Sequence, residues 1–135
     1  MNFRIECVWC KTRTEFDKLY RSNGHDLAIS YSDIFNRLMK SDPYNEEPSD
    51  VIITLYIRKM IMRALNSKIE SESDDFSIAY MFNNLDQDSV TGVHDFMSGL
   101  FDSEIELNLT VINRSDYPKQ GVLSKFNNVK FIDND

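Results

Sequence analysis

The sequence contains little proline, glycine or cysteine, and each shortage narrows the class of protein. Three prolines and four glycines among 135 residues, with 12% aromatic residues, are typical of a globular chain rather than a disordered one. This length predicts one domain, large enough to bury a core. With only two cysteines, Cys7 and Cys10, and no export signal, the expected compartment is the reducing cytoplasm.

Long apolar runs and an excess of basic residues are also missing. The first nine residues, MNFRIECVW, contain one arginine and no long apolar stretch, so they do not read as a signal peptide. The most apolar segment, 51–65, contains Arg58, Lys59 and Arg63 and cannot span a bilayer. A net charge of −7 disfavours direct binding to nucleic acid. It leaves open a basic protein partner, or mimicry of the phosphate backbone.

The clearest structural signal is the segment 76–101. Residues 76–82 form a nearly unbroken apolar run, which is typical of a strand covered on both faces in a parallel sheet. The asparagines at 83–84 predict a turn, and Asp86 or Asp88 can cap the helix that follows. One face of that helix is apolar, with Val90, Val93, Met97, Leu100 and Phe101 at spacings of three and four. The segment therefore predicts one β-α unit.

Strand and helix patterns alternate along the rest of the chain. The other expected strands are 2–9, 27–31, 104–112 and 128–132, and the other expected helices are 11–22, 33–39 and 50–66. Ser32 or Asp33 is the expected cap of the second helix, and Ser49 that of the third. The third helix is apolar around most of its circumference, which predicts that it is well buried. The alternation predicts an α/β fold with three layers: a mostly parallel sheet of four to five strands with helices on both faces.

Cys7 and Cys10 form a C-x-x-C motif between the first strand and the first helix. This placement resembles the thioredoxin and glutaredoxin folds, in which a helix N-terminus lowers the pKa of the first thiol. A thiol-disulfide oxidoreductase is therefore one alternative function. The other interpretation is two small buried residues, one on each side of a strand end. A zinc site would need both cysteines with His25 and His94 at an unsuitable spacing, so no metal is predicted.

Several short motifs occur in an order that resembles small P-loop nucleoside or polynucleotide kinases. The second strand leads into 31–34 (YSDI), the long helix ends in 62–65 (MRAL), and the buried strand is followed by 83–85 (NNL). The resemblance covers most of the chain and implies a parallel α/β fold. It also implies that Asp33 occupies the acceptor-activating position and Asn84 a substrate-binding position.

The sequence departs from this family at the phosphate loop. Such a loop needs glycines, because backbone N–H groups must surround the phosphates in conformations that crowd a Cβ atom. The glycines stand at 24, 92, 99 and 121, and the first strand is joined to the first helix through Cys10, Lys11 and Thr12. We therefore expect a degenerate relative of these kinases that lacks the phosphate loop and binds no nucleotide cofactor. Retained kinase activity is a further alternative.

Charged side chains outside these motifs supply the remaining candidate binding sites. Arg58 and Arg63 could bind an anion in a cleft. The acidic residues that are candidates for binding lie in two segments of the chain. They are Asp42, Glu46, Glu47, Asp50, Glu70, Glu72, Asp74 and Asp75. Without a phosphate loop, triad or metal set, the surface is the expected functional part. We expect a noncatalytic accessory protein, of the kind that phages encode, that acts in the host cytoplasm as a host-factor inhibitor or an assembly adaptor.

Overall fold

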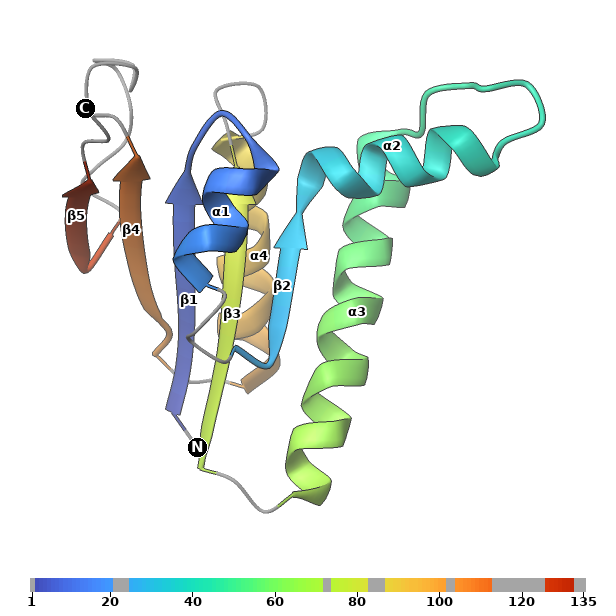
Figure 1. Cartoon of the computed structure of the whole chain (residues 1–135). Helices are drawn as coiled ribbons and strands as arrows, with labels where there is room; N and C mark the ends of the chain where they lie inside the picture. Colours follow the sequence, from blue (N-terminus) through green and yellow to red (C-terminus); the bar gives the residue numbers. More distant parts are fainter. Residues whose placement is uncertain are drawn as a thin grey trace.

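The computed structural model describes residues 2–20, 25–71, 74–82, 87–101, 104–112 and 126–132. Its strands are β1 (Asn2–Trp9), β2 (Leu27–Ser30), β3 (Asp75–Phe82), β4 (Glu106–Ile112) and β5 (Asn128–Ile132). Its helices are α1 (Arg13–Tyr20), α2 (Tyr31–Ser41), α3 (Asp50–Glu70) and α4 (Gln87–Phe101). The strands form one parallel sheet in the order β2-β3-β1-β4-β5. Helices cover both faces (Figure 1), so the predicted three-layer α/β fold is confirmed.

Strand β3 lies in the interior of the sheet, between β1 and β2. Its residues from Phe76 to Phe82 are all buried, as their apolar run predicts. Pairing with β1 runs from Asn2 opposite Asp75 to Trp9 opposite Phe82, while β2 pairs along the other edge. A strand that is hydrogen-bonded on both edges and covered on both faces has no solvated side. This is why its sequence shows no alternation.

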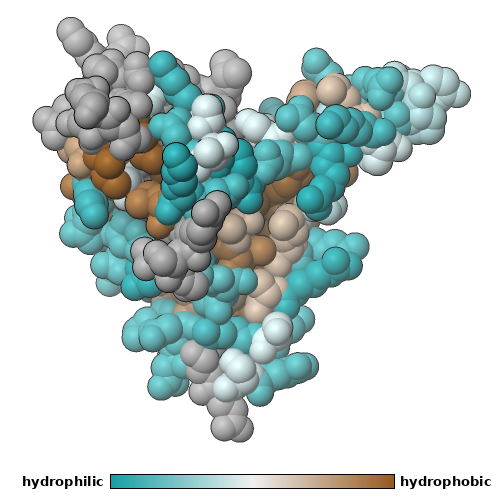
Figure 2. Space-filling view, viewed as in Figure 1, coloured by the Kyte–Doolittle hydropathy of each residue, from teal (hydrophilic) through white to brown (hydrophobic). Residues whose placement is uncertain are grey.

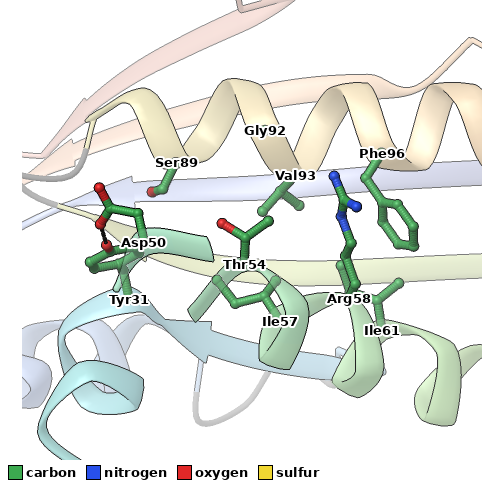
Figure 3. Close-up of a pocket in the computed structure, with 10 residues that line it drawn as sticks. All are labelled: Tyr31, Asp50, Thr54, Ile57, Arg58, Ile61, Ser89, Gly92, Val93 and Phe96. Atoms are coloured by element: carbon green, nitrogen blue, oxygen red, sulfur yellow. Dashed lines mark hydrogen bonds between the residues drawn. The ribbon is translucent and has the colours of Figure 1, made fainter. Parts of the chain in front are cut away.

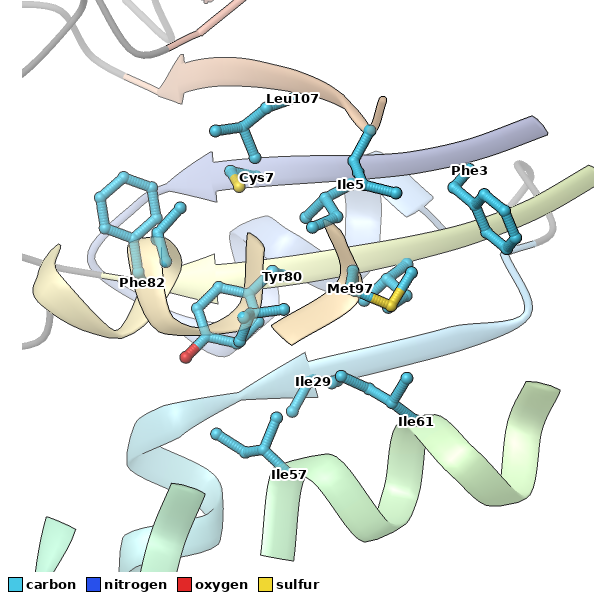
Figure 4. Close-up of a cluster of buried hydrophobic side chains, with 14 of the residues drawn as sticks. Phe3, Ile5, Cys7, Ile29, Ile57, Ile61, Tyr80, Phe82, Met97 and Leu107 are labelled. Atoms are coloured by element: carbon cyan, nitrogen blue, oxygen red, sulfur yellow. The ribbon is translucent and has the colours of Figure 1, made fainter. Parts of the chain in front are cut away.

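The main core lies on the face of the sheet covered by α3 and α4, called here the back face (Figure 4). Alternate residues of the strands reach it, among them Ile5, Tyr80 and Leu107. They pack against one stripe of each helix, formed by Ile53, Ile57, Ile61 and Leu65 in α3 and by Val90, Val93 and Met97 in α4. Spacings of three and four place each stripe on one side of its helix.

The opposite face, called here the front face, has a smaller apolar cluster where α1 lies. Its cluster consists of Val8, Cys10, Phe16, Ala79, Met81 and Ile112, with Leu19 packed against it. Eight helical residues span about 12 Å and eight strand residues about 26 Å, so α1 covers roughly half the length of β1. Beyond α1 the face is polar. The distance from Arg4 Nε to Glu6 Oε1 is 2.9 Å, and Asn108 Nδ2 donates to Glu6 Oε1 at 3.0 Å.

The N-cap of α2 is Ser30, not Ser32 or Asp33 as the sequence predicts. The Oγ atom of Ser30 accepts a hydrogen bond from the backbone N–H of Asp33 at 3.4 Å. The last residue of β2 is therefore also the cap, because strand and helix follow each other without a loop. Ser49 caps α3 as predicted, and its Oγ accepts from the N–H of Ile52 at 3.3 Å.

The prediction that α3 is well buried is wrong. The helix lies beside β2 at the edge of the sheet (Figure 1), and its buried residues form a single stripe. Val51, Ile52 and Leu55 on its outer side are 69%, 53% and 55% exposed. The helix also continues to Glu70, four residues past its predicted end at 66.

Most other predicted element limits agree with the structure to within about two residues. The strands Asn2–Trp9 and Asn128–Ile132 have the predicted bounds. In α4, Leu100 is 43% exposed rather than on the buried face. The predicted turn at 83–84 and the candidate cap Asp86 lie outside the described residues. No helix in the described part of the chain is long and apolar enough to cross a membrane.

Candidate functional site

The end of α2 and the loop that follows it project from the body of the molecule (Figure 1, Figure 2). Residues 42–55, which are this loop and the first turns of α3, are called here the arm. The arm exposes large apolar side chains, which are Tyr44 (83%), Val51 (69%), Ile52 (53%) and Leu55 (55%). Single exposed apolar residues are normal on a protein surface, but several in one short segment make the arm a candidate interaction patch.

Local hydrogen bonds give the loop of the arm a defined conformation. The Oδ1 atom of Asp42 accepts from the N–H of Tyr44 at 2.7 Å, and the carbonyl oxygen of Asp42 accepts from the N–H of Asn45 at 3.1 Å. Asn45 has a φ of 52°, in the left-handed region that asparagine tolerates better than most residues. At the start of α3, Asp50 accepts a hydrogen bond from the hydroxyl of Tyr31.

The arm is acidic as well as apolar. Its carboxylates are those of Asp42, Glu46, Glu47 and Asp50, and residues 41–57 contain no lysine or arginine. Asp42 and Asp50 make the hydrogen bonds described above. Glu46 and Glu47 are exposed, and their side chains have no partner among the described residues. Two carboxylates of the arm are therefore available to a cationic surface.

The second predicted acidic group lies at the other end of α3. Glu70 ends that helix, and Asp74 and Asp75 lie at the start of β3. Asp75 Oδ1 accepts from Asn2 Nδ2 at 3.2 Å, while Glu72 lies outside the described residues. A helix of 21 residues is about 30 Å long, so the structure does not bring the two acidic groups together.

Cys7 and Cys10 lie on opposite faces of the sheet. Cys7 belongs to the back-face core and Cys10 to the front-face cluster, and both are free, buried thiols. Burial, followed by the nearby carboxylate of Glu6, raises the pKa of Cys7. Burial, followed by the carboxylate of Glu15, raises the pKa of Cys10 to about 12. A redox dithiol needs an accessible thiolate, so this geometry favours the interpretation of two buried packing residues.

The residues that the kinase resemblance singles out make structural contacts. Thr12 caps α1, since its Oγ1 accepts from the N–H of Glu15 at 3.3 Å and donates to Glu15 Oε1 at 3.0 Å. Only residues 10–12 join β1 to α1, too few to surround a phosphate group. The carboxylate of Asp33 pairs with Arg13 of α1. Asn84 lies outside the described residues.

The two arginines of the expected anion cleft lie on different sides of α3. Arg58 lines a pocket of about 260 Å³ between α3 and α4, whereas Arg63 is exposed and does not line it. A separation of five residues rotates a side chain about 140° around a helix, so the two cannot share one cleft. The pocket also contains Gly92 of α4, a residue that the sequence offered only as evidence about the phosphate loop.

Neither a metal centre nor a known relative points to a function. No group of three or more histidine, cysteine, aspartate or glutamate side chains in the described part of the chain is placed to hold a metal ion. Comparisons of the chain with protein-family models, with curated proteins and with solved structures find no match. Function must therefore be inferred from the chemistry of the chain's own residues.

Proposed function

We propose that this protein is a noncatalytic accessory protein that binds a basic protein partner through the arm. The observation that carries the proposal is the exposure of Tyr44, Val51 and Leu55 in the same arm as two exposed carboxylates, those of Glu46 and Glu47. Apolar side chains supply the surface that is buried on binding, and a polar rim surrounds it. Exposed carboxylates favour a partner with lysine or arginine around an apolar groove, and they speed association with it.

The conformation of the arm suits this role. Val51, Ile52 and Leu55 lie on one side of a helix, the arrangement by which amphipathic helices enter grooves. The turn at Asp42 holds the adjoining loop in place, so less conformational entropy is lost on binding. Recognition through a projection on a rigid scaffold is common, and such a contact serves an inhibitor or an assembly adaptor equally well.

The geometry gives less support to the two catalytic alternatives. An oxidoreductase would need a thiolate that a substrate can reach, and both thiols are buried. A kinase would need a phosphate loop, and the connection from β1 to α1 is three residues long, Cys10 to Thr12. Turnover of a substrate by the purified protein, abolished by Cys10→Ser or by Asp33→Asn, would contradict the noncatalytic assignment.

Affinity capture with matched variants tests the arm. The tagged protein is used to capture partners from lysate at about 50 and about 300 mM salt. Ile52→Asn and the pair Glu46→Gln with Glu47→Gln should each lose a protein that the wild type retains. Ile69→Asn is the control, because Ile69 is 54% exposed at the other end of α3 and Ile52 is 53% exposed in the arm.

The captured protein is then purified and titrated against each variant by calorimetry. We expect both arm variants to weaken binding at least about tenfold, and the higher salt to weaken the wild type through the same charges. Ile69→Asn should bind as the wild type does. The proposal is wrong if no protein is captured at either salt, or if Ile69→Asn weakens binding as much as Ile52→Asn.

A further inference from the structure

A second feature, independent of the exposed side of the arm, is the pocket of about 260 Å³ between α3 and α4 (Figure 3). Its apolar wall comes from facing stripes of the two helices and includes Ile57, Ile61 and Val93. Ile57 and Ile61 are members of the back-face core, so the wall is continuous with that core. A concave apolar site with a few polar groups is the usual form of a small-molecule site.

The polar groups of the pocket lie at its two ends. Figure 3 shows Arg58 and Phe96 at one end and the hydrogen-bonded pair of Tyr31 and Asp50 at the other, with Thr54 between them. The guanidinium carbon of Arg58 lies 5.1 Å from the centroid of the Phe96 ring. No carboxylate in the described part of the chain forms an ion pair with Arg58. The guanidinium group of Arg58 is therefore available to a carboxylate or phosphate group.

Gly92 provides open space in the wall formed by α4. Apart from its chain neighbours and the backbone of its own helix, a Cβ atom placed on Gly92 would meet no heavy atom of the described residues within 4 Å. Glycine is a poor residue for a helix interior, and α4 gains no close packing from its presence. Gly99 of the same helix has equally open surroundings but does not line the pocket, so it is a matched control for substitutions at Gly92.

We propose that this pocket binds a small amphiphilic anion: a single flat apolar ring with a carboxylate or phosphate at one end and a hydroxyl or amine at the other. Arg58 binds the anionic group, and the ring packs against Phe96 and Val93. Asp50 has a second carboxylate oxygen beside the one that Tyr31 uses, and it accepts a hydrogen bond from the hydroxyl or amine. The volume lies just below the range of about 300–1,000 Å³ for drug-sized ligands, which fits a ligand of one ring.

Three small molecules test whether the anionic group is needed for binding and which anionic group is preferred. The protein is titrated by NMR with 4-hydroxyphenylacetate, 4-hydroxyphenyl phosphate and the neutral 4-hydroxyphenylacetamide. We expect at least one anion to bind saturably with a Kd below about 1 mM, and the amide to bind at least about tenfold more weakly. A difference between the two anions identifies the preferred anionic group. Failure of both anions to bind, or equal binding of the amide, would overturn the proposal.

Paired substitutions locate the binding. Arg58→Met should weaken the anions at least about tenfold, and Gly92→Leu should abolish binding by filling the pocket. Arg63→Met and Gly99→Leu should leave the Kd unchanged, and thermal melting verifies that each variant is folded. If Gly92→Leu does not fold, the difference in Kd between Arg58→Met and Arg63→Met still shows whether the anions bind in this pocket. If Arg58→Met and Arg63→Met weaken anion binding equally, or if Gly92→Leu and Gly99→Leu do, the anions bind outside this pocket and the proposal is wrong.

Discussion

The back and front faces of the sheet belong to the same strands but differ in what covers them. On the back face, α3 and α4 cover the strands, and residues such as Ile5 and Leu109 are 1% exposed. On the front face α1 is the one helix of the described part of the chain that lies over the sheet, and beyond its eight residues side chains such as Glu6, Asn108 and Asn128 are polar and hydrogen-bonded to one another. The length of the covering helix therefore decides how far along a strand both faces stay apolar.

The largest expected effect is the loss of a large side chain from the back-face core. Ile61 of α3 is 0% exposed, so Ile61→Ala should lower the free energy of unfolding by about 2–5 kcal/mol, through lost burial and the cavity that remains. Leu55→Ala, on the exposed side of the same helix, should change it by less than about 0.5 kcal/mol. Urea unfolding measures both. Similar losses would mean that the outer side of α3 is also packed.

The two cysteines allow a smaller comparison of the same faces. Cys7→Ser places a hydroxyl in the back-face core and should lower the free energy of unfolding by roughly 1–3 kcal/mol. Cys10→Ser should cost less, because the Cys10 Sγ already donates to the carbonyl oxygen of Thr12 at 3.5 Å and a hydroxyl can do the same. Urea unfolding of both variants measures the difference. A larger loss for Cys10→Ser would contradict this assignment of the two faces.

Some parts of this fold could be predicted from the sequence, and others depend on how the elements pack. The unbroken run at 76–82 identified the strand buried on both faces, because few other structures hide that many consecutive side chains. The cap of α2 was missed, since Ser30, Ser32 and Asp33 are all good caps and only the end of β2 decides among them. The outer side of α3 could not be predicted either. Its residues are apolar, and only the position of the helix at the sheet edge exposes them.

The candidate sites also contain residues that the sequence could predict and residues that it could not. Charge alone was enough to predict Glu46 and Glu47 as candidate binding residues, but the exposure of the apolar side chains in the same arm follows from tertiary structure. Helical spacing alone is enough to separate Arg58 from Arg63, because five residues do not return to the same side of a helix. Gly92 inside a predicted helix was also a usable signal of a special site.

A pH effect should distinguish the front face from the back. Burial lowers the pKa of His25, whose Nδ1 lies 3.2 Å from Ser77 Oγ on the front side of β3. Near pH 6 the unfolded chain therefore binds more protons than the folded chain, so the free energy of unfolding should fall as the pH drops from about 7.5 to about 5.5. His25→Gln should reduce this slope, as urea midpoints at the two pH values will measure.

Asp26, next to His25 in the sequence, affects the free energy of unfolding at lower pH than His25 does. Burial opposes ionisation, but hydrogen bonds from Lys68 and from the N–H of Ser77 leave its pKa lowered overall. A carboxyl with a lowered pKa stabilises the fold above its ordinary pKa and loses that contribution only as the pH falls below about 4. The slope between pH 7.5 and 5.5 is thus a test of the histidine. An unchanged slope in His25→Gln would refute the assignment.

The smallest expected effect comes from the polar part of the front face. Asn108 Nδ2 donates to Glu6 Oε1 at 3.0 Å, and its Oδ1 accepts from Asn128 Nδ2 at 2.9 Å. These contacts are partly solvated, so Asn108→Ala should lower the free energy of unfolding by only about 0.2–1 kcal/mol. The next residue, Leu109, points to the back face and is 1% exposed, so Leu109→Ala should cost about 2–5 kcal/mol. Urea unfolding of these two neighbours compares the faces within one strand, and equal losses would mean that the front face is covered as fully as the back.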